Sequence, residues 1–259
     1  MPKFSANLTM LFNEVDFLDR FERAARAGFK GVEYLFPYVW SKEQLVSALG
    51  KHGLEQVLHN LPAGNWQAGE RGIACLPGRE GEFQEGVGTA IEYAKALKCH
   101  RLNCLVGKVP EGIPLEKVRQ TLVSNLRFAA TALEKEKIRL LVEPLNSQDI
   151  PGFYLVHTQD ALQLFREIGH PNLWLQYDVY HMQVMEGNLT RTISTNLSRI
   201  AHIQIADNPG RHEPGTGEIN FTSLFRFIDE ARYDGWIGCE YVPVGKTEDG
   251  LQWVKPYLS

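Results

Sequence analysis

Short apolar segments of the kind that form β-strands recur eight times along the chain, and helix-like patterns separate them. They lie at residues 4–7, 31–36, 54–60, 100–106, 139–145, 173–180, 200–206 and 236–242. Gly, Pro, Asn or charged residues bound each segment, as is typical of strands. Eight strands alternating with about eight helices in 259 residues is the rhythm of a parallel (β/α)8 TIM barrel, so we predict that fold.

A doubly wound α/β sheet is the competing interpretation. That fold usually carries a glycine-rich phosphate turn after its first strand. Here the first predicted strand continues into "ANLTMLFNE", and neither a GxGxxG motif nor a P-loop occurs in the sequence. No linker or low-complexity segment divides the chain. We therefore expect one barrel domain over residues 1–259.

Two predicted loops are longer than a barrel needs. They are residues 60–78 and 207–220, which follow the third and the seventh predicted strands. Barrel enzymes carry their sites at the C-terminal ends of the strands, so these loops are expected to border a site. The pattern at 158–169 predicts one of the outer helices, beginning at a Thr158 cap and ending at Gly169.

Composition and charge exclude several classes of protein. The net charge of −4 argues against nucleic-acid binding, which needs a basic surface. The cysteines lack CxxC spacing and predict reduced thiols rather than a disulfide framework or a zinc site; they are Cys75, Cys99, Cys104 and Cys239. No signal peptide opens the chain, and no apolar stretch reaches the roughly 18 residues of a membrane span. We expect a cytoplasmic protein without a membrane segment.

Four oxygen-bearing side chains stand near the ends of the last four predicted strands. They are Glu143, Asp178, Gln204 and Glu240. At a barrel mouth they would form an all-oxygen cage with three carboxylates, which is costly without a cation and suits Mg²⁺ or Mn²⁺ better than Zn²⁺. Alternatively, they are unrelated polar residues at strand ends. Four such residues on consecutive strands favour the metal cage.

Three histidines lie close to the same predicted rim. His181 follows Asp178 in "DVYHM" and could be a metal ligand, a hydrogen-bond donor to substrate, or a loop residue. His59 precedes "NLPAG" at a strand end and is a candidate for substrate binding. His202 shares the face of Gln204 one layer deeper, where a structural role is as plausible as a functional one.

The two long loops carry charged residues that could bind a substrate. Glu70 and Arg71 lie between glycines in "AGERG", and Arg211 precedes "HEPGTG". An arginine suits a substrate carboxylate because it donates two parallel hydrogen bonds, although either arginine could instead be a solvent-exposed loop residue. Trp66 could cover the site and exclude water, or pack on the rim.

Long stretches of the sequence resemble the hydroxypyruvate isomerase family of the xylose isomerase-like barrel superfamily. The resemblance covers about residues 3 to 253 and is carried by "ANLTMLF", "GVEYLFPY", "HNLPAGNWQAGERGIACLPGRE", "LNCLVG", "VEPLN", "QYDVYHMQVMEGNLT", "HIQIADNPGRHEPGTGEIN" and "GWIGCEY". It implies a (β/α)8 barrel with one divalent metal ion held by Glu143, Asp178, Gln204 and Glu240. It also implies that Glu143 and Glu240 move the protons that interconvert hydroxypyruvate and tartronate semialdehyde.

Other activities in the same superfamily fit less well. Ketose 3-epimerases have a histidine ligand where this chain has Gln204. A 2-oxo-tetronate isomerase shares the "HEP" and "GWIGCEY" motifs but differs around His59 and Arg71, so the length of the substrate stays open. An endonuclease for abasic DNA would need many histidines for a zinc cluster and a basic face. A non-catalytic sugar-acid-binding barrel would be expected to lack part of the ligand set. A homo-oligomer is also compatible with the resemblance.

Overall fold

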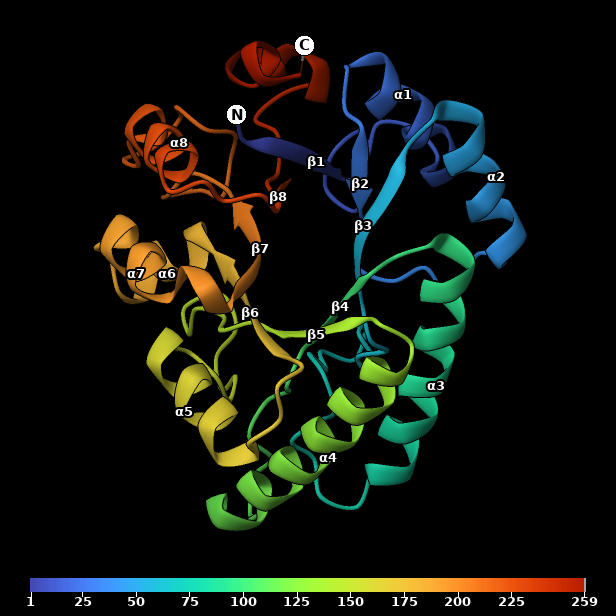
Figure 1. The fold of residues 1–259 in the computed structure, drawn as a ribbon, viewed down its shortest axis with the longest axis vertical. Coiled ribbons are helices and arrows are strands. Elements are labelled where there is room, and N and C mark those ends of the chain that lie inside the picture. The colour runs from blue at the N-terminus through green and yellow to red at the C-terminus, as the bar shows by residue number, and fades with distance from the viewer. Residues whose placement is uncertain (259) are drawn as a thin grey trace.

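The computed structural model describes residues 1–258, in which eight parallel strands form one closed barrel (Figure 1). The strands are β1 (Lys3–Asn7), β2 (Gly31–Glu33), β3 (Glu55–Asn60), β4 (Arg101–Cys104), β5 (Arg139–Val142), β6 (Leu173–Asp178), β7 (Ile200–Ile205) and β8 (Trp236–Cys239). Each strand pairs with its neighbour in sequence, and β8 closes the ring on β1. The predicted (β/α)8 barrel is confirmed, and the doubly wound sheet is wrong.

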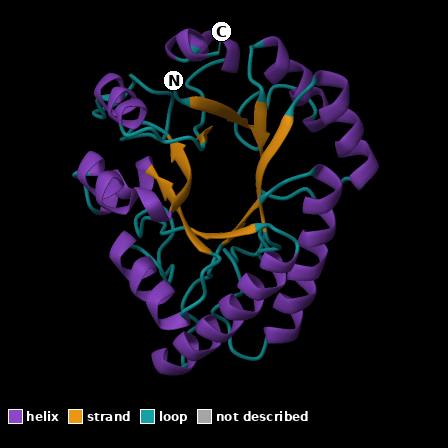
Figure 2. Cartoon of the chain, in the orientation of Figure 1, coloured by secondary structure: helices purple, strands orange, loops and turns teal. Residues whose placement is uncertain are grey.

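Helices surround the strands on the outside, as Figure 2 shows. They are α1 (Arg20–Arg26), α2 (Lys42–His52), α3 (Glu80–Leu97), α4 (Leu115–Lys135), α5 (Thr158–Ile168), α6 (Val179–Met185), α7 (Leu189–Asn196) and α8 (Phe221–Glu230), with 3-10 helices η1 (Phe17–Asp19), η2 (Leu197–Arg199), η3 (Thr247–Trp253) and η4 (Lys255–Tyr257). The cap of α5 is His157, so the predicted Thr158 cap is wrong by one residue. None of the helices within residues 1–258 combines the length and apolar character needed to cross a bilayer.

The fifth strand ends earlier than the apolar pattern predicts. Its ladder with β4 stops at Val142, so Glu143 and Pro144 follow the last paired residue. The amide of Leu145 donates to the Leu155 carbonyl, outside the sheet. The missing N–H of Pro144 therefore removes no ladder bond, and Glu143 is free to face the barrel mouth.

The inside of the barrel has an apolar zone and a polar zone. Four buried residues with two partly buried tryptophans form the apolar zone: Val57, Leu58, Leu141, Ala201, Trp174 and Trp236. Nearer the C-terminal ends of the strands, the inward side chains are polar and hydrogen-bond across the barrel, for example Asn7 to Glu240 and Gln204 to Glu33. The fold therefore positions these buried carboxylates and amides at the C-terminal mouth of the barrel.

Candidate functional site

Two buried carboxylates, at the ends of β5 and β6, each have one oxygen without a hydrogen-bond partner in residues 1–258. Glu143 is 4% exposed, and its Oε2 accepts hydrogen bonds of 2.9 Å from both Asn103 and Gln176. Asp178 is fully buried, and its Oδ1 accepts from the Tyr180 amide at 2.8 Å. Glu143 Oε1 and Asp178 Oδ2 have no hydrogen-bond partner within residues 1–258. Buried orphan oxygens are costly, so this pair is suited to a cation or a substrate.

Gln204 and Glu240 complete the predicted set on β7 and just after β8. The Gln204 amide nitrogen donates to Glu33 at 2.8 Å and to Glu240 at 3.2 Å, and its oxygen accepts from Gln176 at 2.6 Å. Glu240 also accepts from Asn7 at 3.0 Å. Because its nitrogen faces two carboxylates, the Gln204 oxygen points away from them. Hydrogen bonds through Gln176 thus join Glu143, Gln204 and Glu240, whereas within residues 1–258 Asp178 is not part of this hydrogen-bonded group.

Burial and mutual repulsion shift the carboxyl pKa values upward. Burial raises the pKa of Glu143 well above its ordinary value, and the charges of Glu240 and Asp178 raise it further. Burial likewise raises the pKa of Glu240 to about 8, against the lowering effect of Arg211. Burial also raises the pKa of Asp178, again opposed by Arg211. A carboxyl group with a pKa of about 8, such as Glu240, can both accept and donate a proton, which is the property that acid–base catalysis requires.

The hydrogen bonds around His181 fix its tautomer. Its Nδ1 faces two donors, the Asn146 backbone amide at 3.1 Å and the Asn146 side-chain nitrogen at 2.7 Å. The Asn146 side chain cannot be flipped, because its oxygen accepts from the amides of Gln148 and Asp149. Nδ1 is therefore an acceptor, and the neutral ring carries its proton on Nε2. Burial, and then the Arg211 charge, hold the pKa of His181 well below its usual value, so the ring stays neutral.

Because Nε2 carries the proton, His181 can donate a hydrogen bond from this atom, which is one of its three predicted roles. Nε2 lies 3.6 Å from Asp178 Oδ2 and borders the cavity. A protonated nitrogen has no lone pair for a metal ion, although Glu143, Asp178 and His181 each offer an atom within 4.8 Å of the others. His181 is thus a hydrogen-bond donor at the mouth, and the metal-binding alternative disagrees with its surroundings.

Arg211 lies among the carboxylates rather than on an exposed loop. Its Nη2 is 2.6 Å from Glu240 Oε2 and 3.6 Å from Asp178 Oδ2, and its guanidinium sits 5.2 Å from the centre of the Tyr180 ring. Its Nε is buried without a partner in the described chain. Burial alone would lower the pKa of Arg211, but the charges of Glu240, Asp178 and Glu143 raise it. The arginine remains charged and offsets part of the carboxylate repulsion.

The long loop after β3 contributes Trp66 and Arg71 to a cavity of about 250 Å3 at the mouth. The Arg71 guanidinium stacks on the Trp66 ring at 3.9 Å and donates to the backbone oxygens of Trp66 and Glu70. Glu70 faces elsewhere: it forms an ion pair with Arg79 and accepts from the Asn65 amide. Both Glu70 oxygens thus hold the loop together, and the structure does not place Glu70 in the lining of the cavity.

His59 also lies outside the cavity. The register between β2 and β3 shifts by one residue before Leu58, so Val57 and Leu58 both contact the apolar zone. The alternation then resumes, with Asn60 facing the cavity and His59 facing the helices. There the centre of the His59 ring lies 6.2 Å from the centre of the Tyr38 ring. A bulge inverts the facing of every later residue in a strand. The structure therefore does not bring His59 to the cavity with the other predicted residues.

The burial of His59 makes the stability of the protein depend on pH. Burial lowers its pKa to about 3, whereas the unfolded chain should titrate near 6.5. The depressed pKa means that stability is present above pH 6.5 and is lost as the pH falls toward the folded pKa. Between pH 7 and pH 5 this one group should reduce the unfolding free energy by about 2 kcal/mol. Urea unfolding of His59→Phe should show a correspondingly smaller loss, whereas the exposed His100→Gln variant should match the wild type. Equal losses in all three proteins would contradict the assignment.

Sequence reasoning gave no role to a fourth buried carboxylate, which lies one layer below. Glu33, on β2, accepts from Ser5 at 2.7 Å and from Gln204, and it lies 2.9 Å from His202 Nε2. Burial would raise the Glu33 pKa, but His202 and these hydrogen bonds lower it, so the group stays ionised. Its position near a strand end was the available signal. Glu33 holds the Gln204 amide nitrogen, and this orients the Gln204 oxygen.

Glu143 and Asp178 offer oxygens close enough to each other to bind one divalent cation, and each has an oxygen buried without a partner in residues 1–258. Three neighbouring carboxylates with raised pKa values are the arrangement that a cation would stabilise. Because His181 carries its proton toward the site, the oxygen set of Glu143, Asp178, Gln204 and Glu240 remains the predicted ligand set.

Comparison with known proteins establishes the family. The model of a family described as xylose isomerase-like TIM barrel matches residues 21–257. The chain belongs to the xylose isomerase-like TIM barrel family. Among members of that family, it is 58% identical over 257 residues to the hydroxypyruvate isomerase of Escherichia coli (strain K12), covering 99% of this chain and 100% of the relative. It is 45% identical to a 2-oxo-tetronate isomerase of Cupriavidus necator, over the full length of both.

A solved structure is similar over the same extent. It is described as an AP endonuclease of family 2 from Brucella melitensis, with 47% identity, a TM-score of 0.97 and 99% of each chain covered. The resemblance to hydroxypyruvate isomerases is thus confirmed, and the chain is an enzyme of the isomerase class. Within the xylose isomerase-like family, its relatives support a keto-acid isomerase.

Proposed function

We propose that the protein interconverts hydroxypyruvate and tartronate semialdehyde through an enediolate. One observation carries the proposal: two buried glutamates with raised pKa values, Glu143 and Glu240, line a cavity of about 250 Å3 that also contains two arginines. Carboxyl groups whose pKa values are raised suit proton transfer at a carbon beside a carbonyl. The arginines suit a substrate that bears a carboxylate.

The reaction needs one proton to leave carbon and another to return to the neighbouring carbon. In the forward direction, one glutamate removes a proton from C3 of hydroxypyruvate, and the C3–H electrons form the C2–C3 double bond of the enediolate. The other glutamate delivers a proton to C2, and the hydroxyl proton on O3 passes to O2 as the C3 carbonyl forms. His181 Nε2–H donates to a substrate oxygen and stabilises its developing charge.

Glu143, Asp178, Gln204 and Glu240 would hold the divalent cation, Mg²⁺ or Mn²⁺. When bound, it would supply Lewis-acid stabilisation of the negative charge on the enediolate oxygens. Asn103 and Gln176 fix the Glu143 carboxylate through its Oε2, so its Oε1 keeps one orientation toward the cavity. Glu33 orients Gln204 in the same way from below.

Arg71 is proposed to bind the substrate carboxylate. One of its terminal nitrogens is committed to the loop backbone, and its stacking on Trp66 holds the fork in one plane. Arg71→Lys keeps the charge but loses the fork, so KM for hydroxypyruvate should rise about tenfold or more with a smaller change in kcat. Arg166→Lys, on the exposed side of α5, is the matched control and should leave KM unchanged. A wild-type KM in Arg71→Lys would exclude the assignment.

Comparing the reaction rates of a three-carbon and a four-carbon substrate tests which substrate length the enzyme prefers. Reaction rates with hydroxypyruvate and with a four-carbon 2-oxo-tetronate should be compared by NMR in deuterated water. The signals to follow are the carbon-bound protons of substrate and product, including the aldehyde proton. The proposal expects a higher kcat/KM for hydroxypyruvate and deuterium incorporation from solvent. A preference for the four-carbon acid would assign the 2-oxo-tetronate activity, and binding without exchange would indicate a non-catalytic barrel. Nicking of an abasic duplex would instead support an endonuclease.

We further propose a cytoplasmic location and allow for a homo-oligomer. The four cysteines are all free and buried, which suits a reducing compartment.

A further inference from the structure

The N-terminal mouth of the barrel carries a second cavity with the opposite charge. It has a volume of about 450 Å3 and lies at the end of the barrel away from the carboxylates. Its lining includes Lys3, Arg101, Lys137 and Arg139, with Asp234 as the one carboxylate. The whole chain is acidic, with a net charge of −4, so this concentration of positive charge is local. Clefts lined by one sign of charge concentrate oppositely charged ligands.

Three of these cations are the first residues of their strands, and their side chains point into the barrel. With a period of two, Lys3 shares a face with Asn7, Arg101 with Asn103, and Arg139 with Glu143. The apolar zone separates the two ends, so the basic groups neither reach nor neutralise the carboxylates at the other mouth. The inward-facing residues of the strands therefore make the N-terminal mouth basic and the C-terminal mouth acidic.

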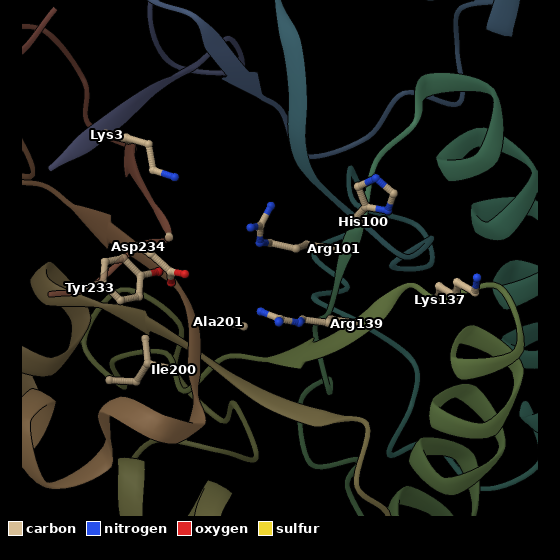
Figure 3. A pocket seen from close by; sticks show the side chains of 10 residues that line it. Lys3, His100, Arg101, Lys137, Arg139, Ile200, Ala201, Tyr233 and Asp234 are labelled. Atoms are coloured by element: carbon tan, nitrogen blue, oxygen red, sulfur yellow. The ribbon is translucent and has the colours of Figure 1, made fainter.

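The side chains converge on one space. Figure 3 shows Arg101 and Arg139 extending from β4 and β5 toward Tyr233 and Asp234, with Lys3 pointing into the same opening; Lys137 lies farther away on the rim. Arg101 and Arg139 are direct neighbours in the register of the two strands. Like charges on neighbouring strands repel each other, and an anion bound between them relieves this repulsion.

These cations lack carboxylate partners. None of the four Lys and Arg side chains lies within 4.0 Å of an acidic oxygen in residues 1–258, and the buried Nε of Arg101 has no hydrogen-bond partner there. The aromatic contacts that they do make, Arg139 with Trp174 at 4.5 Å and Lys3 with Trp236 at 5.7 Å, hold the charged groups at the opening. Uncompensated donors in a preformed cavity are typical of a ligand site.

We propose that this basic mouth, formed by Lys3, Arg101 and Arg139, binds a small anion with two linked phosphate groups, either free or on a nucleotide. Paired arginine forks match phosphate oxygens, and three cations match the charge of a diphosphate better than that of a monocarboxylate. The opening lies within the ring of strand ends, where a compact ligand fits and a folded macromolecule does not.

Calorimetric titration of the intact protein with pyrophosphate tests the proposal, with orthophosphate and ADP as separate arms at the same ionic strength. We expect saturable binding at one site per chain and weaker binding of orthophosphate. ADP binding as tight as that of pyrophosphate assigns the nucleotide source, and weaker ADP binding assigns the free anion. The absence of saturable pyrophosphate binding overturns the proposal.

Variants locate the site. The double variant Arg101→Gln/Arg139→Gln should bind pyrophosphate at least tenfold more weakly while keeping wild-type isomerase turnover, so its failure is separate from any failure of the proposed activity. Arg166→Gln/Arg199→Gln removes the same charge from another surface hollow and should bind as the wild type does. Asp234→Asn, an exposed position, should bind more tightly. Undiminished binding by the first variant, or unchanged or weaker binding by Asp234→Asn, contradicts the proposal.

Discussion

Replacing Glu143 by glutamine should lower kcat for hydroxypyruvate by about 10²- to 10⁴-fold, the usual contribution of a general acid or base. Glu240→Gln should produce a loss of similar size, because each glutamate serves one of the two carbon atoms. Glutamine keeps the shape and can still accept the hydrogen bonds of Asn103 and Gln176 at position 143. The loss would therefore report proton transfer rather than misfolding.

Stability provides the control for this experiment. Removing a buried carboxylate whose pKa is raised by its surroundings relieves a desolvation cost, so metal-free Glu143→Gln should unfold at a temperature no lower than the wild type. The exposed Glu85→Gln, on α3, should change neither kcat nor the melting temperature. Near-normal turnover in either Glu143→Gln or Glu240→Gln would disprove the two-glutamate transfer.

Removing divalent metal with EDTA should abolish the isomerisation, and Mg²⁺ or Mn²⁺ should restore it. The physical reason is the set of three neighbouring carboxylates, which Arg211 neutralises only in part. A cation that binds the folded protein alone should also stabilise it, by about 2.7 kcal/mol at one hundred times its dissociation constant. Thermal unfolding with and without metal measures this effect independently of activity.

Asp178→Asn serves as the control for the metal experiment. Its Oδ1 can keep the bond to the Tyr180 amide, but the variant loses a charge from the proposed ligand set. The metal-dependent rise in melting temperature should shrink strongly, whereas Glu85→Gln should retain it. Full turnover in the presence of the chelator would show that the metal has no catalytic role.

The alternation of strands and helices was enough to predict the barrel. Apolar periodicity and the residues that bound each segment are local properties, and all eight predicted strands are present, although several end sooner than predicted. At β5 the apolar run continued to residue 145, but the ladder ended at Val142. Burial alone extends an apolar pattern beyond the hydrogen-bonded strand, so sequence overestimates strand length.

The sequence also indicated the four oxygen donors, because polar residues inside apolar runs are conspicuous. It did not indicate that His59 and Glu70 lie outside the lining of the cavity, and it left Glu33 without a role. A one-residue bulge in β3 turned His59 outward, and a distant arginine, Arg79, engaged Glu70. Neither effect has a signature in the neighbouring residues.

Sequence by itself determined the closed barrel, the rim on which the site lies and the donor types at the ends of the last four strands, because these follow from patterns that repeat over a few residues. Only the tertiary structure decided which nitrogen of His181 carries the proton, which way Gln204 points and which carboxylates Arg211 contacts. Those outcomes depend on hydrogen bonds and charges between groups far apart in the chain. Such contacts form only when the barrel closes and removes the groups from water.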